Sequence, residues 1–141
     1  MMMGLCRVFV YGTLMTGMSN FCIVKPFVKS VTLGKLRGKV YDLPYGFPGA
    51  SLGEKDQWIV GEILELIEID TAMRLLDQLE DYYGPSSPQN MYEKSIAEIV
   101  TLEGEIFDAY VYTWAKIEQL NKIGTFIDHG NWRHYRSEGK G

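Results

Sequence analysis

Short apolar runs rich in β-branched and aromatic residues recur along this chain, separated by breaks that contain glycine or proline. Runs of this kind are typical of β-strands, and the breaks indicate turns. The pattern predicts six strands, at residues 8–10, 27–33, 35–41, 58–67, 91–101 and 106–114. We expect an irregular or bulged hairpin around Gly34, with Gly38 in its second arm, and another hairpin through residues 102–105. Residues 42–53, with two prolines and three glycines, are predicted to be a loop.

One segment has the period of an amphipathic α-helix. Its apolar face is formed by four side chains, Ala72, Leu75, Leu76 and Leu79. Asp70 can serve as the N-cap, and Gly84 followed by proline ends the helix. Residues 85–90 then form a polar loop. From residue 117 onward, the pattern indicates only a short helix among further glycines.

Strands interrupted by one main helix do not follow the regular strand–helix alternation of a doubly wound sheet. We therefore expect an α+β fold with a mixed, mostly antiparallel, barrel-like sheet, one main helix and short extra helices. The 141 residues suit a single domain over residues 1–141 with one sizeable core. Its composition, 46% apolar and 23% charged, is ordinary for a globular protein and argues against disorder.

Charge and hydropathy narrow the classes of partner. A formal net charge of −4 gives no electrostatic reason to expect nucleic acid. A locally basic stretch fits a solvated hairpin, with a nucleic-acid face as the alternative: Lys25, Lys29, Lys35, Arg37 and Lys39. No apolar run reaches the ~20 residues needed to cross a bilayer. Residues 1–6 show no basic leader before an apolar stretch, so we expect no secretory signal and no membrane partner.

Two cysteines, Cys6 and Cys22, are too few for a disulfide framework. Both lie in apolar runs, so we expect buried free thiols. Free thiols and the lack of a signal predict a cytoplasmic protein.

Several common catalytic motifs are absent from the sequence. It contains no G-x-S-x-G and no G-x-G-x-x-G after the first strand, and residues 34–39 lack the spacing of a phosphate-binding loop. His129 and His134 are five positions apart, which does not place two ligands on one helical face, and no cysteine lies nearby. We therefore expect neither a metal site nor a cofactor, and we interpret both histidines as surface or packing residues.

Two segments remain as candidates for chemistry. The first strand ends at a glycine, where main-chain N–H groups can form an anion-binding concavity. We name this segment the 11–14 turn; it consists of Tyr11, Gly12, Thr13 and Leu14. Glu80 lies nearest the apolar stripe among the helix's acidic residues, and partial desolvation there raises a carboxyl pKa toward values useful for proton transfer. On helix geometry alone, the alternative that Glu80 flanks the core and pairs with a Lys or Arg is favoured.

The tyrosines allow two interpretations. Alternation places Tyr110 and Tyr112 on one face of their strand. Cross-strand packing with hydroxyls that reach water is the interpretation favoured by spacing, and pocket lining is the alternative. The same alternatives hold for Tyr82, Tyr83 and Tyr92.

The 11–14 turn, followed later by Leu76-Asp77-Gln78-Leu79-Glu80, resembles the γ-glutamylcyclotransferase-like superfamily. The branch that includes γ-glutamylamine cyclotransferases and AIG2-like proteins is the most similar. The resemblance covers nearly the whole chain. Residues 34–43, 60–64, 92–94 and 109–112 are similar to further segments of that family.

The resemblance implies an intramolecular cyclisation that splits an amide. The free α-amine of a γ-glutamyl group attacks its own side-chain carbonyl, 5-oxoproline forms, and an amine leaves, as in an amine-releasing lyase or acyltransferase. Glu80 would take a proton from the attacking ammonium and return one to the departing amine. The 11–14 turn, with Tyr11, Gly12, Thr13 and Leu14, would offer main-chain N–H groups to the substrate carboxylate and the developing oxyanion. Attack within one molecule requires no protein nucleophile, metal or cofactor.

Alternatives to this enzyme remain open at the level of sequence. The protein could be a non-catalytic module that keeps the same pocket for a small metabolite, or an interaction protein that uses its sheet surface. The released amine could be an amino acid, an isopeptide-linked lysine or a specialised metabolite amine. Residues 15–20 and 85–90 lie where family members differ, and the oligomeric state is also open.

Overall fold

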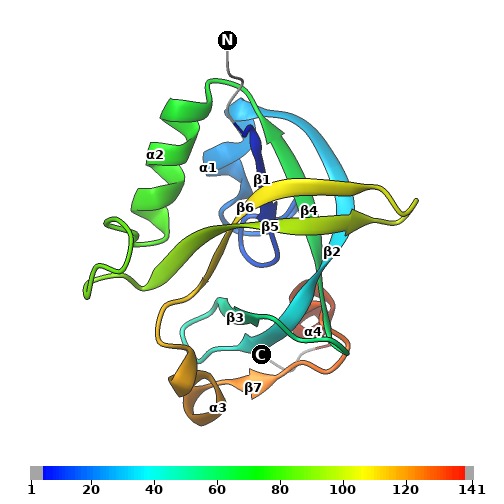
Figure 1. Cartoon of the computed structure of the whole chain (residues 1–141), viewed down its shortest axis with the longest axis vertical. Coiled ribbons are helices and arrows are strands. Elements are labelled where there is room, and N and C mark those ends of the chain that lie inside the picture. Colours follow the sequence, from blue (N-terminus) through cyan, green and yellow to red (C-terminus); the bar gives the residue numbers. More distant parts are fainter. Residues whose placement is uncertain (1–4, 139–141) are drawn as a thin grey trace.

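The computed structural model describes residues 5–138 (Figure 1). Residues 1–4, which carry part of the argument about a leader, and residues 139–141 lie outside this range. The described strands are β1 (Arg7–Val10), β2 (Val28–Asp42), β3 (Pro48–Leu52), β4 (Trp58–Leu66), β5 (Tyr92–Thr101), β6 (Ile106–Trp114) and β7 (Thr125–Phe126). The described α-helices are α1 (Phe21–Val24), α2 (Ile69–Leu79), α3 (Leu120–Ile123) and α4 (Trp132–Ser137).

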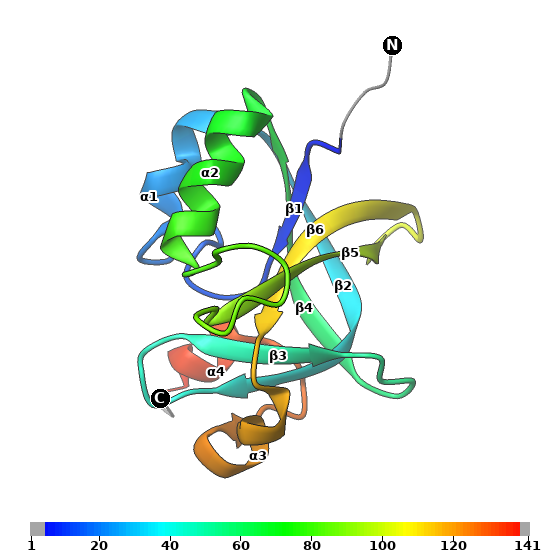
Figure 2. The ribbon, with the colours of Figure 1, turned by 60° about the vertical axis from the view of Figure 1, so that its left-hand side comes forward.

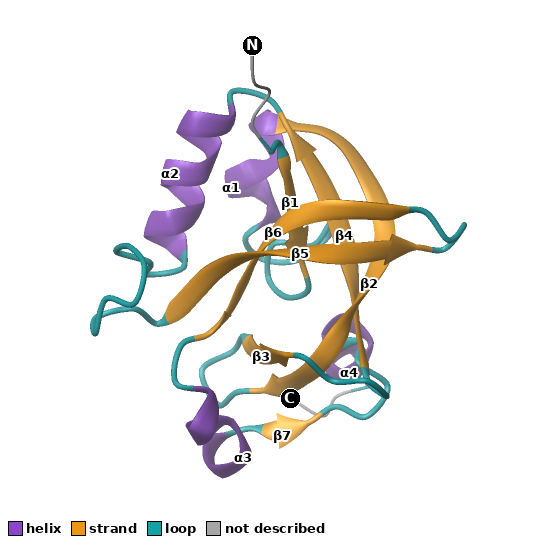
Figure 3. Cartoon of the chain, viewed as in Figure 1, coloured by secondary structure: helices purple, strands orange, loops and turns teal. Residues whose placement is uncertain are grey.

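Five strands form a closed barrel in the order β2–β4–β1–β6–β5, because β5 also pairs with β2. The pairing of β1 with β6 is parallel, and the other four barrel pairings are antiparallel. The far end of β2 continues beyond the barrel and pairs with β3 and β7. Figure 3 shows the helices outside the strands, with α1 and α2 along one flank and α3 and α4 near β3 and β7. The predicted α+β fold with a mixed, mostly antiparallel barrel is confirmed.

The predicted hairpin around Gly34 is wrong, because β2 is one continuous strand of 15 residues. Gly34 pairs with Gly61 of β4 and with Thr101 of β5, and a Cβ on it would lie 2.9 Å from Cγ2 of Ile99. A Cβ on Gly38 would collide with the carbonyl oxygen of Ser51 in β3. Both glycines therefore allow close approach of neighbouring strands rather than a turn. The predicted loop at residues 42–53 is likewise wrong in part, since β3 occupies its second half.

The main helix, α2, differs from its predicted bounds. It begins at Ile69, and its N-cap is Glu68 in a left-handed conformation (φ 49°), so Asp70 lies in the first turn and is not the cap. There its carboxylate complements the positive end of the helix dipole. The helix ends at Leu79, well before Gly84, because Asp81 turns the chain away with φ 50°.

Alternation along β1 divides the interior into two packed regions. Val8 and Val10 contact the region beneath α2, which includes the buried residue Leu76. Phe9 contacts the other region, which includes Trp132 of α4. Figure 2 shows α1 and α2 side by side over the first region. The strand that leads to the 11–14 turn is therefore packed on both faces, which fixes where the turn begins.

The cysteine prediction is only partly correct. Cys6 and Cys22 form no disulfide, but Cys22 is exposed and Cys6 is half-buried. Cys22 lies in α1, a single helical turn, so the apolar run around it cannot turn every side chain inward. Within residues 5–138, none of the helices has the length and apolar character that a membrane-crossing segment needs.

Candidate active site

A cavity of about 170 Å³ lies where the end of β1 meets the end of α2. All four residues of the 11–14 turn line this cavity, and so does Glu80. Tyr92 of β5, Tyr112 of β6 and Pro48 of β3 complete much of the wall. The structure thus brings both candidate segments from the sequence to one cavity.

The 11–14 turn is held by its own backbone. The N–H of Met15 donates to the Gly12 carbonyl at 3.1 Å, and the N–H of Asn20 donates to the Thr13 carbonyl at 2.8 Å. The Asn20 side chain also donates to Oγ1 of Thr13 at 3.0 Å. Within residues 5–138, no group accepts from the N–H groups of Gly12, Thr13 or Leu14. Because buried N–H groups are nearly always paired, three unpaired donors beside a cavity form a ready anion site.

The ring of Pro48 also leaves no room for a side chain at Gly12. Its backbone is not left-handed, but a Cβ on it would lie 2.6 Å from Cγ and 2.7 Å from Cδ of Pro48. Pro48 is itself held in place, since the hydroxyl of Tyr92 donates to its carbonyl oxygen at 2.5 Å. The sequence argument considered only the approach of a ligand to this glycine, and the structure adds the proline ring.

Glu80 is the C-cap residue of α2, and its side chain is half-buried. In the described part of the chain its carboxylate has neither a hydrogen-bond donor nor a cationic partner, so the predicted alternative of an ion pair is wrong. Burial raises the pKa of Glu80 from 4.5 to about 7, and the charge of Asp81 adds to this. A carboxyl group with such a pKa can both accept and donate a proton near neutral pH.

Three tyrosine hydroxyls around the cavity donate to protein acceptors. Tyr11 donates to the Tyr112 carbonyl at 2.6 Å, Tyr92 donates to Pro48, and Tyr112 donates to Oδ1 of Asp77 at 2.5 Å. Burial raises the pKa of all three phenols, and the Glu80 carboxylate adds to each effect, so they remain protonated. The interpretation of Tyr92 and Tyr112 as packing residues with hydroxyls in water is therefore wrong. The other three tyrosines weighed in the sequence do not line the cavity.

Asp77 is tied to the wall of the cavity. Its carboxylate accepts from Nζ of Lys94 at 3.0 and 3.1 Å as well as from Tyr112. The sequence argument placed Asp77 further toward solvent than Glu80, yet it is the acid of α2 that forms the ion pair. The ion pair forms because the fold brings Lys94 of β5, 17 positions away, beside Asp77. Helix periodicity alone cannot predict this contact.

Among the described residues that line the cavity, Glu80 is the charged one, and no lysine, arginine or histidine joins it. A carboxylate ligand would therefore be held by main-chain N–H groups and by polar side chains such as Thr13 and Asn20. An ammonium group would find Glu80 as its counter-charge. The cavity thus suits a small molecule that carries both groups.

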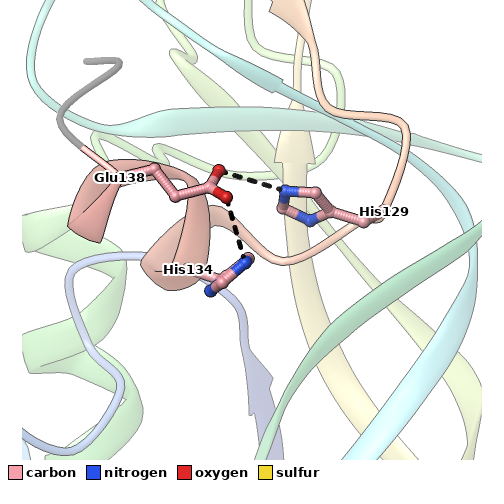
Figure 4. A group of neighbouring side chains, drawn as sticks. All are labelled: His129, His134 and Glu138. Atoms are coloured by element: carbon pink, nitrogen blue, oxygen red, sulfur yellow. Dashed lines mark ion pairs between the residues drawn. The ribbon is translucent and has the colours of Figure 1, made fainter.

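A separate cluster joins the two histidines to Glu138 (Figure 4). Nε2 of His129 lies 3.8 Å and Nε2 of His134 lies 3.3 Å from the Glu138 carboxylate, and all three residues are exposed. The prediction of surface histidines is confirmed. Nδ1 of His129 accepts the N–H of Asn131 at 3.2 Å, so in the neutral ring Nε2 bears the proton and faces Glu138.

A family model described as "Gamma-glutamyl cyclotransferase, AIG2-like" matches residues 8–134. A curated relative from Niallia circulans, named γ-L-glutamyl-butirosin B γ-glutamyl cyclotransferase, is 28% identical over 130 residues. That match covers 92% of this chain and 77% of the relative.

Two solved structures are similar in fold. YkqA from Bacillus subtilis matches with a TM-score of 0.70 and 22% identity over 96% of this chain, which spans 42% of the YkqA chain. An AIG2-like protein from Mus musculus matches with a TM-score of 0.55 and 26% identity, over 79% of this chain and 78% of the mouse chain. The barrel, with the helices around it, is therefore a known fold.

Proposed function

The chain belongs to the γ-glutamyl cyclotransferase, AIG2-like family, and on this basis we propose that it cyclises the γ-glutamyl group of a γ-glutamyl amine or peptide to 5-oxoproline. In this reaction a bond forms between the substrate's α-nitrogen and its γ-carbonyl carbon. The bond between that carbon and the departing amine breaks. No water is consumed, and the atoms of the substrate are divided between 5-oxoproline and the amine.

The main support for the proposal is that two polar groups without protein partners in the described chain, the Glu80 carboxylate and the N–H groups of the 11–14 turn, line the same cavity. The Glu80 carboxylate has no protein partner within residues 5–138 and a pKa raised to about 7, and the N–H groups of the 11–14 turn have no acceptor there. A γ-glutamyl substrate has an α-ammonium for the first and an α-carboxylate for the second. The polar groups of this cavity and of such a ligand therefore complement one another.

Glu80 acts as the proton carrier in the proposed mechanism. It accepts a proton from the α-ammonium, which frees the lone pair that attacks the γ-carbonyl. The carbonyl oxygen becomes an oxyanion. The N–H groups of the 11–14 turn stabilise both this oxyanion and the α-carboxylate. Collapse of the tetrahedral intermediate expels the amine, to which Glu80 delivers the first proton. The ring nitrogen still carries a second extra proton, which passes through Glu80 to the amine, so that a lactam and an ammonium product remain. Folding the substrate so that its own amine meets its carbonyl supplies much of the rate.

The released amine is tested with a panel of substrates. Purified protein is incubated with γ-glutamyl amino acids, γ-glutamyl-ε-lysine and γ-L-glutamyl-butirosin B, the last chosen from the name of the Niallia circulans relative. Mass spectrometry then follows 5-oxoproline and the free amine in equal amounts. We expect turnover of at least one compound. Saturable binding by calorimetry without any 5-oxoproline would instead favour a metabolite-binding protein.

A further inference from the structure

Three polar groups of Thr16 are fixed by two residues from distant elements. Its N–H donates to Oε1 and its hydroxyl to Oε2 of Glu62, both at 2.7 Å. Its carbonyl accepts from Nη1 of Arg133 at 2.7 Å. Arg133 also contacts the Glu62 carboxylate at 3.4 Å, so the three residues form one network, which we call the Thr16 clamp.

The Thr16 clamp acts on the loop that contains the 11–14 turn. Thr16 lies two positions after Leu14, and the loop is closed on its other side by the bonds between Thr13 and Asn20. Glu62 stands directly across β1–β4 from Val10, the last strand residue before the turn. The turn is therefore fixed at its entrance by the sheet and at its exit by the clamp. Its N–H groups have no protein acceptor in the described chain, so their direction depends on how the loop is held at these points.

The carboxylate of Glu62 is buried and depends on this network for its hydrogen bonds. It is 3% exposed, and a buried carboxylate is costly unless its oxygens are paired and hydrogen-bonded. Both oxygens are satisfied, and two of the bonds go to Thr16 rather than to the rigid sheet. Arg133 supplies the positive charge from α4, with a side chain that is 35% exposed. The ion pair therefore spans the barrel, the loop and the C-terminal helix.

We propose that Arg133 is a positioning residue that, through Thr16 and Glu62, holds the 11–14 turn in the conformation that receives the substrate. The inference rests on the proposed function. Arg133 does not line the cavity, so its effect on turnover is indirect. Displacement of positioning groups by about 1 Å can reduce rates about 100-fold. Loss of the clamp therefore needs to move the turn only slightly to lower the rate.

The same helix offers a matched control. Arg136 also pairs with a mostly buried carboxylate, Asp42, and its side chain is 34% exposed. It has no bond to the loop. We expect Arg133→Ala to lower kcat/KM by about 10- to 100-fold, and Arg136→Ala to leave it unchanged. Added guanidinium ion, well below denaturing concentrations, should restore activity to Arg133→Ala alone, because it can occupy the vacated position between Thr16 and Glu62. Equal kcat/KM in the two variants, or no rescue, would overturn the proposal.

A second measurement needs no turnover. Amide hydrogen exchange at Met15 and Thr16, whose N–H groups donate to Gly12 and Glu62, should become faster in Arg133→Ala than in Arg136→Ala, while exchange in β4 stays the same in both. Thr16→Val, which keeps the shape but removes the hydroxyl bond, should show the same direction, and Thr16→Ser should restore slow exchange. If the wild type releases no 5-oxoproline, the proposed function fails, yet the exchange data still decide the clamp. Unchanged exchange at Met15 and Thr16 would refute it.

Discussion

The hydroxyl of Tyr11 donates a 2.6 Å hydrogen bond to the backbone carbonyl of Tyr112, 101 positions further along the chain. The bond lies just beyond the parallel pairing of β1 with β6 and extends that contact into the cavity wall. It joins the beginning of the 11–14 turn to the strand that carries Tyr112. The wall is therefore held by side chain to main chain bonding where the sheet itself ends.

Removal of this bond should cost stability. Tyr11→Phe leaves the buried Tyr112 carbonyl without its donor, so we expect the free energy of unfolding to fall by about 1–2 kcal/mol. Urea denaturation measures the change. Tyr83→Phe is the control, because Tyr83 is 62% exposed and a surface change of this kind stays within about 0.5 kcal/mol. Equal losses in both variants would show that the Tyr11 bond contributes nothing.

Replacement of Glu80 tests the proposed proton transfer. Glu80→Gln keeps the shape of the side chain but cannot carry a proton, so we expect kcat to fall by about 10²- to 10⁴-fold with substrate binding retained. Asp81→Asn is the matched control when both variants are assayed well above pH 7, where Glu80 is ionised with either residue at position 81, and asparagine tolerates the left-handed backbone there. The assay follows 5-oxoproline, and calorimetry follows binding. Full activity in Glu80→Gln would exclude the carboxylate as proton carrier.

The pH dependence of activity should report the same group. The proposed base must be ionised to accept a proton, and burial raises the pKa of Glu80 to about 7. We therefore expect kcat/KM to rise with pH, with a midpoint near 7. Because the charge of Asp81 contributes to the raised pKa, Asp81→Asn should move the midpoint to lower pH. A midpoint that stays in place in Asp81→Asn would assign the rise to another group.

Stability should respond to pH with the opposite sign. The pKa of Glu80 is higher in the folded protein than its ordinary value of 4.5, so the folded state holds its proton more tightly. Ionisation therefore destabilises the fold as pH rises from 4.5 to 7. We expect Glu80→Gln to gain up to about 3 kcal/mol of unfolding free energy relative to wild type between pH 4.5 and pH 8. A difference that is flat with pH, measured by urea denaturation, would contradict the buried state of this carboxyl.

The contact between Gly12 and Pro48 predicts a compensating pair of substitutions. A Cβ at position 12 would lie 2.6 Å from Cγ of Pro48, so Gly12→Ala should shift the proline ring and weaken substrate binding. Pro48→Ala removes Cγ and Cδ, and should relieve this effect when the two changes are combined. The affinities of wild type, both single variants and the double variant for a non-cyclisable substrate analogue give the coupling free energy between positions 12 and 48. Simple additivity would mean that the ring is not what excludes a side chain. Gly12→Val, which is larger still, should weaken binding more than Gly12→Ala.

The sequence predicted the barrel class and four strands, because β1, β4, β5 and β6 show strong local patterns. It failed at β2, where Gly34 and Gly38 resemble breaks but accommodate neighbouring strands. That role depends on Ile99 and Ser51, residues far along the chain, and no local window contains it. The exposed Cys22 was missed for a similar reason, since a short apolar run does not reveal whether it forms a strand or one helical turn.

The sequence predicted residues that line the cavity but not the residues that support them. The 11–14 turn and Glu80 were found from a motif and from helix periodicity, and they share the cavity. Thr16, Glu62 and Arg133 had no signal, because they are 46 and 71 positions apart and each is an ordinary residue in its own element. Networks of this kind become visible only when the chain is folded.

The lining of the cavity lacks cationic side chains within residues 5–138, and this has a consequence for how the protein can diverge. Peptide N–H groups are common to almost every residue, so an exchange of side chains rarely deletes them. Binding of a glutamyl group through these main-chain N–H groups would therefore be little affected by most point mutations. Other parts of the lining, such as Phe47 and Met91, are formed by side chains that point mutations can replace. If the proposed cyclisation is correct, related proteins could release different amines while binding the same glutamyl group.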